Sequence, residues 1–261
     1  MKALPWKKIG KYLALAYGIT WFCWLCESLL FRVLPQLQKG PAVLFVLGGF
    51  GPTVAACLCL PGGYSWSKLK KFMGARRKEY FGLALGFAAL LAGLAFLLFA
   101  TTAQDLQSGI SLDPKMLVGA LLMWLMASIF FGGNEELGWR GTLHPLLLAN
   151  IPSWLSPLLV GLVWVFWHLP LWWIPGNVHQ GTPFWPFAIL GLAFSYWLCA
   201  IYDATRSILV CMGFHGFVNT MLGIFVPGEN MGFGLGLIGL TLVAILGSAY
   251  FVAKDVPRAH A

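Results

Sequence analysis

The sequence predicts an all-α, polytopic membrane protein with eight transmembrane helices. Its 261 residues are 59% hydrophobic and only 10% charged, whereas a soluble domain carries about 25% charged residues. The mean hydropathy is +0.78. Apolar stretches of about 20 residues, the length that crosses a bilayer, recur along the whole chain. We therefore expect residues 1–261 to form a single membrane domain.

Eight apolar stretches are long enough to span a membrane. The first follows a lysine-rich start, and because no small-residue cleavage site follows it, we expect it to be retained as a helix rather than removed as a signal peptide. The second contains Gly48-Gly49 and Gly51-Pro52, which we expect to kink it. In chain order the stretches are 12–34, 42–60, 81–100, 116–140, 155–173, 184–202, 208–226 and 232–252.

The basic residues predict the orientation, because cytoplasmic loops are enriched in Lys and Arg. With the N-terminus inside, 14 of the 17 basic residues fall on the cytoplasmic side, so we expect both termini in the cytoplasm. The membrane itself is expected to be a bacterial inner membrane. The net charge of +8 then reflects topology, and nucleic acid is not expected as a partner. The 14 are Lys2, Lys7, Lys8, Lys11, Lys68, Lys70, Lys71, Arg76, Arg77, Lys78, Arg140, Arg206, Lys254 and Arg258.

The link at residues 61–78 carries six of these basic residues, and it has two interpretations. It either only determines topology or lies on anionic membrane lipid as a short amphipathic helix. The six cysteines all lie within apolar stretches, and we expect them to pack as small hydrophobic residues without a disulfide framework. Cys23 and Cys26 form a C-x-x-C, but no second pair follows at zinc-finger spacing.

The candidate site begins at residues 130–141, where two adjacent carboxylates, Glu135 and Glu136, end a run that carries no charge from Met116 to Phe131. A carboxylate within a bilayer costs about 2.5–3.5 kcal/mol on insertion scales, so such residues often mark function. Glu136 and Arg140 are four apart and can pair on one helical face, which leaves Glu135 about 100° away and free to face something else. The alternative is an interfacial charge cluster that merely ends a transmembrane helix.

Three further polar residues lie inside later stretches: His168 in the fifth, and His215 and Asn219 in the seventh. His215 and Asn219 are four apart and share a helical face. At about 1.5 Å per residue, Glu135 and His215 lie about 8–10 Å from the cytoplasmic helix ends, and His168 lies deeper. Each residue alone could be a packing group that bonds helices together, but as a set they predict a site. His144, His179 and His260 are expected in loops or the tail and are given no role.

This set of residues is suited to hydrolysis. A desolvated glutamate, Glu135, can act as a general base towards water, and His168 can orient that water or transfer its proton. His215 and Asn219 can donate hydrogen bonds to the oxyanion that forms when water attacks a carbonyl group. Alternatively Glu135, His168 and His215 can hold zinc with an open position for water. No H-E-x-x-H stands on one helix to pre-arrange such a zinc site, and both mechanisms stay open.

The motifs Glu135-Glu136-x-x-x-Arg140, Trp164-x-x-x-His168 and His215-x-x-x-Asn219 resemble those of the CPBP family of intramembrane proteases. That family includes the CAAX prenyl endopeptidase and bacteriocin-processing and abortive-infection proteins. The resemblance covers roughly residues 116–226. The sequence differs from the family pattern at Trp164, where the family usually has phenylalanine, but the residue is still aromatic.

The resemblance implies eight helices around an intramembrane active-site cavity. It implies that Glu135 and His168 activate water, that His215 and Asn219 hold the oxyanion, and that Glu136 and Arg140 support the site. The implied substrate is a peptide or protein, with a lipidated one among the options, and the implied activity is endopeptidase cleavage near the cytoplasmic face. The cofactor stays open between zinc and a metal-free mechanism.

Two other functions compete with a peptidase. A catalytically silent immunity or scaffold protein could keep the same fold, although the presence of every motif residue favours the enzyme. A small transporter could use Glu135 and the histidines as a proton relay. That function predicts repeats or paired broken helices in the two halves, and none is visible in the sequence.

Overall fold

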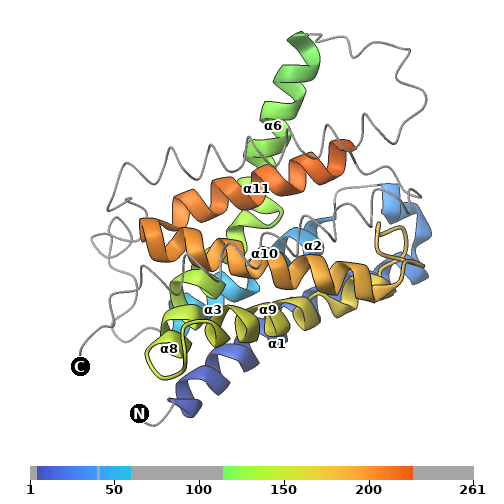
Figure 1. Ribbon diagram of the computed structural model, residues 1–261. Coiled ribbons are helices and arrows are strands. Elements are labelled where there is room, and N and C mark those ends of the chain that lie inside the picture. The colour runs from blue at the N-terminus through green and yellow to red at the C-terminus, as the bar shows by residue number, and fades with distance from the viewer. Residues whose placement is uncertain (1–4, 40–41, 60–113, 226–261) are drawn as a thin grey trace.

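The computed structural model describes residues 5–39, 42–59 and 114–225, and within these ranges every regular element is helical (Figure 1). The prediction of an all-α chain is therefore confirmed for this part of the protein. The longer helices are α1 (Trp6–Val33), α6 (Pro114–Phe130), α9 (Leu155–Trp167), α10 (Phe184–Thr205) and α11 (Ile208–Phe225). The shorter ones are α2 (Val43–Gly49), α3 (Gly51–Cys59), α7 (Glu136–Gly138) and α8 (His144–Leu148).

Four described helical stretches are long and apolar enough to cross a membrane: Trp6–Val33, Val118–Leu148, Leu155–Trp173 and Phe184–Thr205. They correspond to the first, fourth, fifth and sixth predicted spans, and they identify an integral membrane protein. The apolar helix Ile208–Thr220, within the seventh, is shorter. The third and eighth predicted spans, 81–100 and 232–252, lie outside the described residues, so a total of eight stays a prediction.

The second predicted span is broken into α2 and α3 rather than merely kinked. The break falls at Phe50, between α2 and α3, and Pro52 lies in the first turn of α3. Proline has no amide hydrogen to bond the carbonyl oxygen of Gly48, four residues earlier. The hydroxyl of Thr20 on α1 donates to that oxygen instead, at 2.7 Å. The side chain of one helix thus satisfies a backbone group that the break leaves open.

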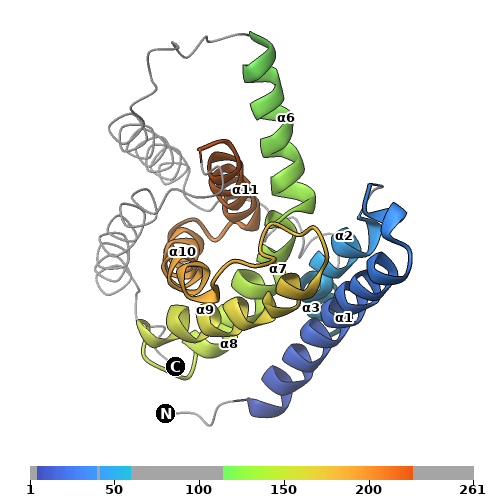
Figure 2. The same ribbon diagram turned by 90° about the vertical axis from the view of Figure 1, so that its right-hand side faces the viewer.

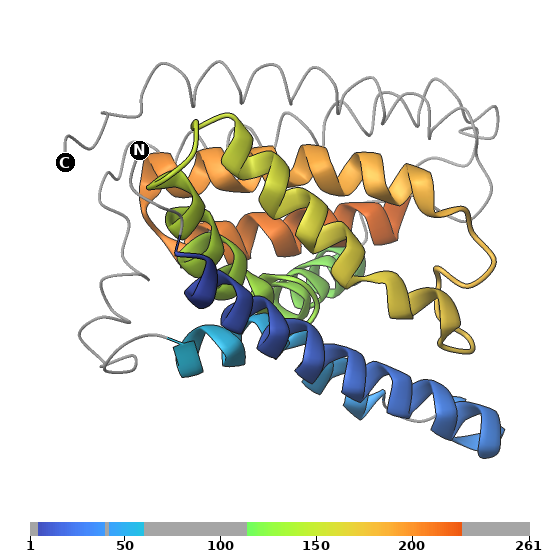
Figure 3. The same cartoon turned by 90° about the horizontal axis from the view of Figure 1, so that it is seen from below.

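The helices pack in neighbouring pairs. Figures 2 and 3 show α1 lying along α2 and α3, and α9 beside α10. Helix α6 packs against α11, which also contacts α10 (Figure 1). Helix α7 contacts both α3 and α11, so the segment that carries Glu135 and Glu136 lies between the N-terminal helices and the C-terminal ones.

Aromatic rings form the centre of the core. Three tryptophans are almost completely buried: Trp24 on α1, Trp167 on α9, and Trp139, which directly follows α7. The ring centroids of Trp24 and Trp167 lie 4.7 Å apart, those of Trp167 and Trp139 5.8 Å, and those of Trp139 and Tyr12 5.9 Å. Offset and edge-to-face aromatic pairs at such distances add about 0.5–1.5 kcal/mol beyond their buried area. This ring cluster fixes α1 against α9 and against the segment that follows α7.

Side-chain donors also bond helices together through backbone carbonyl groups. Tyr17 donates to the carbonyl oxygen of Val163 at 2.5 Å, Ser195 to that of Pro157 at 2.9 Å, and Trp124 to that of Gly213 at 2.8 Å. Such bonds between membrane helices contribute about 0.6 kcal/mol each on average. They use polar groups that would otherwise stay unpaired in an apolar interior.

His144 is not in a loop, and the prediction for this residue was wrong. It begins α8 and is completely buried. Its Nδ1 atom lies 2.8 Å from Ser156 Oγ, and its Nε2 atom lies 3.1 Å from Asp203 Oδ2. One imidazole therefore bonds α8 to both α9 and α10. An isolated histidine followed by proline gives no sequence signal for partners 12 and 59 residues away.

Candidate active site

The segment that carries the two carboxylates changes helical type three times within eleven residues. Helix α6 ends at Phe130, a 3₁₀ turn covers Gly133–Glu135, α7 follows, and Trp139–Leu143 forms a π-helical turn. Gly132 starts the segment with φ of 124°, in the region that favours glycine, and its amide donates to Asn134 Oδ1 at 2.9 Å. Helical irregularities of this kind are frequent at functional sites.

Glu136 and Arg140 form the predicted ion pair. Arg140 Nη1 lies 3.2 Å from Glu136 Oε1, and both side chains are fully buried. The same carboxylate oxygen lies 2.6 Å from Nδ1 of His215 on α11, a contact that was not predicted. Because a carboxylate accepts, Nδ1 of His215 carries the proton, and Nε2 of a neutral His215 has a free lone pair. Glu136 therefore orients His215.

Glu135 faces away from this pair, as predicted, and it meets two tryptophans. Its Oε2 atom accepts hydrogen bonds from Trp164 Nε1 at 2.5 Å and from Trp139 Nε1 at 3.2 Å. Oε1 accepts no hydrogen bond from the residues that the structure describes. The Glu135 side chain is 5% exposed. The carboxylate is thus anchored through one oxygen, and the other is left for a further partner.

His168 follows the last residue of α9, within the fifth predicted span. Its Nδ1 atom lies 2.8 Å from the carbonyl oxygen of Trp164, and since a carbonyl only accepts, Nδ1 carries a proton. Nε2 of the neutral ring is therefore a proton acceptor. The ring of Phe187 on α10 lies edge-on to the imidazole with centroids 5.0 Å apart.

Asn219 and His215 meet at Gly132. A Cβ atom on Gly132 would lie 2.5 Å from both Asn219 Nδ2 and His215 Nε2, so only glycine allows these two nitrogens to approach the turn. Asn219 Nδ2 donates to the carbonyl oxygen of Phe131 at 2.8 Å. The two residues expected to hold an oxyanion thus lie side by side, against the turn that precedes Glu135.

Trp164 lies at the centre of the site, which the sequence reasoning missed. Besides its bond to Glu135 and its carbonyl contact with His168, its ring centroid lies 5.4 Å from that of His215. The guanidinium carbon of Arg140 lies 4.7 Å from the same ring. The signal was present in the sequence: tryptophan replaces the usual phenylalanine, and it adds one N–H donor.

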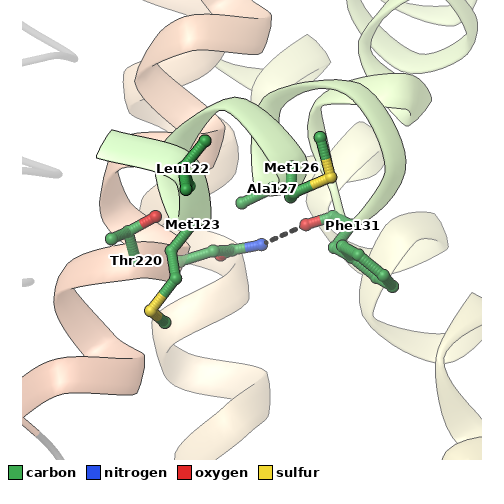
Figure 4. A pocket seen from close by; sticks show the side chains of 7 residues that line it. Leu122, Met123, Met126, Ala127, Phe131 and Thr220 are labelled. Atoms are coloured by element: carbon green, nitrogen blue, oxygen red, sulfur yellow. Dashed lines mark hydrogen bonds between the residues drawn. The ribbon is translucent and has the colours of Figure 1, made fainter. Parts of the chain in front are cut away.

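An open groove of about 450 Å³ lies between α6 and α11 (Figure 4). It reaches Asn219, and Figure 4 shows the hydrogen bond to Phe131 at this end. Apart from Asn219 and Thr220 its lining is apolar, and it does not include Glu135, His168 or His215. The predicted cavity around all four side chains therefore stays a prediction. The lining residues are Leu122, Met123, Met126, Ala127, Phe131, Asn219 and Thr220.

The geometry does not fit the zinc alternative. Among the described residues, no group of three or more His, Cys, Asp or Glu side chains could hold a metal ion, so Glu135, His168 and His215 do not form a ligand set. Trp164 contacts all three.

His144 and His179 lie outside this cluster. His179 lies in the loop before α10, as predicted, with its ring stacked on Trp172 at 4.7 Å between centroids. Burial lowers the pKa of His179 below its ordinary value, so the ring is neutral at pH 7. All six cysteines are free thiols. His260 lies outside the described residues.

The comparison with protein families covers the same part of the chain. Residues 117–221 match the family model of the type II CAAX prenyl endopeptidase Rce1-like proteins. This part of the chain is similar to the Rce1-like family. The Rce1-like region extends from α6 into α11 and contains all six predicted site residues, Glu135, Glu136, Arg140, His168, His215 and Asn219. No curated protein matches the chain.

Proposed function

We propose that this protein is an intramembrane endopeptidase of the CAAX type, which hydrolyses a peptide bond near the cytoplasmic membrane face with activated water. One observation carries the proposal: a buried carboxylate, Glu135, is anchored through Oε2 by two indole groups while Oε1 has no partner among the described residues. A base needs this combination of a fixed position and one available oxygen. The Rce1-like match supports a peptide substrate, and the family name favours a prenylated one.

In the proposed mechanism, Glu135 Oε1 takes a proton from water as the water oxygen attacks the peptide carbonyl carbon. His168 Nε2, the acceptor nitrogen, orients the same water. The negative charge that develops on the carbonyl oxygen is stabilised by the amide group of Asn219, and His215, held by Glu136, lies beside it as the second member of the expected oxyanion pair. When the C–N bond breaks, Glu135 returns its proton to the leaving nitrogen.

The decisive experiment replaces Glu135 by glutamine, which keeps the shape of the side chain but takes no proton at neutral pH. General-base catalysis contributes about 10² to 10⁴ in rate. We therefore expect Glu135→Gln to fold normally and to lose at least about 10²-fold in cleavage. The assay is release of fluorescence from an internally quenched, S-farnesylated CAAX peptide, with the protein in proteoliposomes.

Glu27→Gln is the matched control, because Glu27 is also a buried carboxylate, but it lies on α1. This variant should cleave like the unaltered protein. His168→Ala should resemble Glu135→Gln, and Asn219→Ala should lose about 10²- to 10³-fold, the usual effect of one oxyanion donor. Full activity in Glu135→Gln would rule out the proposed function. A silent immunity or scaffold protein would show no cleavage and would keep its cellular phenotype in all three site variants.

A further inference from the structure

The hydrogen bond between Trp164 and Glu135 depends on a group that phenylalanine lacks. Trp164 Nε1 lies 2.5 Å from Glu135 Oε2, and the Trp164 side chain is 4% exposed. Hydrogen bonds to ionised groups are about twice as strong as those between neutral groups. The residue at this position therefore does more than fill space: it provides a buried donor to the carboxylate that the proposed function uses as its base.

Both indole donors bind the same carboxylate oxygen. Trp139 donates to Oε2 from one helical turn after Glu135, and Trp164 donates from α9, 29 residues after Glu135. Two donors on one oxygen fix the plane of the carboxylate and leave Oε1 as its available acceptor. The hydrogen bond from Trp164 is the shorter of the two, and it connects Glu135 to another helix, α9.

The Trp164 ring is itself held on several sides. Arg140 lies over it at 4.7 Å, and the ring of Phe194 on α10 packs at 5.7 Å between centroids. The backbone carbonyl group of Trp164 accepts from His168 Nδ1 at 2.8 Å. A single rigid residue thus determines where the carboxylate of Glu135 and the imidazole of His168 lie relative to each other.

We propose that Trp164 is a positioning residue, whose indole N–H orients the Glu135 carboxylate and favours its ionised, proton-accepting form. This inference rests on the proposed function, in which Glu135 is the base. It assigns to the N–H group of one side chain a part of catalysis that an aromatic ring alone does not supply.

The test is Trp164→Phe, which keeps an aromatic ring and removes the donor. Loss of a hydrogen bond to a charged group should lower kcat/KM for the farnesylated CAAX peptide about tenfold to a hundredfold, with the change in kcat rather than KM. A donor favours the ionised carboxylate, so without it the acidic limb of the kcat/KM–pH profile should move to higher pH. The charged neighbours of Glu135, namely Glu136 and Arg140, are unchanged in this variant, and so are His168 and His215, which contact the Trp164 ring.

Trp167→Phe is the matched control. Trp167 lies one turn further along α9, is fully buried, and its Nε1 has no hydrogen-bond partner among the described residues. We expect this variant to keep the pH profile of the unaltered protein. In the Glu135→Gln background, Trp164→Phe should cause little further loss of the residual rate, because the two groups act as one unit.

Three outcomes would overturn the inference. If Glu135→Gln is inactive but Trp164→Phe keeps full kcat and an unchanged pH profile, the N–H has no part in positioning the base, and the proposed function stands. If Trp164→Phe and Trp167→Phe lose activity and thermal stability equally, the role is structural only. If Glu135→Gln itself stays active, the proposed function fails, and the role of Trp164 fails with it.

Discussion

At the scale of single residues, the buried pair of Glu136 and Arg140 contributes more to the orientation of His215 than to the stability of the fold. Both side chains are fully buried, and Glu136 Oε2 and Arg140 Nε and Nη2 have no hydrogen-bond partner among the described residues. Removing two charges from water costs several kcal/mol per ion, so a pair with incomplete hydrogen bonding adds little net stability. The pair is better explained by what Glu136 does for His215, which it holds at 2.6 Å.

Removing one partner of the pair should nevertheless destabilise the protein strongly. Arg140→Ala leaves Glu136 buried without its cation, and such a change typically costs about 3–5 kcal/mol. We expect a clearly lower Tm in detergent, together with a loss of cleavage. Arg32→Ala is the control: Arg32 is exposed and donates to the carbonyl oxygen of Trp173 at 3.1 Å, so its loss should change stability by about 0.5 kcal/mol or less. An unaltered Tm in Arg140→Ala would contradict this account of the pair.

The proposed catalysis should also be independent of metal removal. The described residues offer no cluster of ligands for a metal, and Glu135 is instead anchored by two indole N–H groups. Treatment with EDTA followed by buffer exchange should leave cleavage of the farnesylated peptide unchanged. Elemental analysis of the active protein should find well under one metal ion per chain. Loss of activity with EDTA that returns on adding zinc would restore the metal mechanism.

Local spacing predicted part of the site, and contacts over long sequence distances made up the rest. Glu136 and Arg140 are four residues apart, so one helical turn brings them together and the pair could be predicted. His215 is 79 residues from Glu136 and Trp164 is 29 from Glu135. No periodicity encodes such contacts, because they depend on how α9 and α11 pack against the segment at residues 133–143.

At the scale of helices, the break between α2 and α3 depends on a side chain of α1. Thr20 is fully buried, and its hydroxyl bonds the Gly48 carbonyl oxygen that Pro52 cannot bond. Thr20→Val keeps the shape but removes this buried hydrogen bond, which should cost about 0.5–1.5 kcal/mol. We expect a lower Tm in detergent, with Thr20→Ser, which keeps the hydroxyl, close to the unaltered protein. Equal stability in Thr20→Val and Thr20→Ser would show that the hydroxyl does not matter.

Helix positions were predictable to the extent that apolar length alone defines them. The fifth and sixth spans begin at the predicted residues, Leu155 and Phe184, because each follows a polar or proline-rich link. The break at Phe50 was only partly predictable, since Gly-Pro pairs indicate a kink but do not show whether the helix continues. The role of His144 was not predictable, because its partners lie on two other helices.

At the scale of the whole molecule, the site is supported by helices from outside the Rce1-like region. That region covers residues 117–221, whereas α1, α2 and α3 precede it. Trp24 of α1 packs on Trp167 of α9, and the hydroxyl of Thr53 on α3 donates to the carbonyl oxygen of Asn134 at 2.5 Å. The N-terminal helices therefore contact both α9 and the segment beside Glu135.

The orientation of the chain in the membrane can be tested with reporter fusions. Fourteen of the 17 basic residues lie on one side if the termini are cytoplasmic and the chain crosses eight times. Arg206 occupies the turn between α10 and α11, so it should face the cytoplasm, which is the face near which we propose cleavage. Fusions at Lys78, Arg206 and the C-terminus should report the cytoplasm, and those at Gln107 and Glu229 the outside.

Lys78, Gln107 and Glu229 lie outside the described residues, so Arg206 is the critical position. A fusion at Arg206 that reports the outside would refute the eight-helix topology and reverse the face at which the substrate is cut.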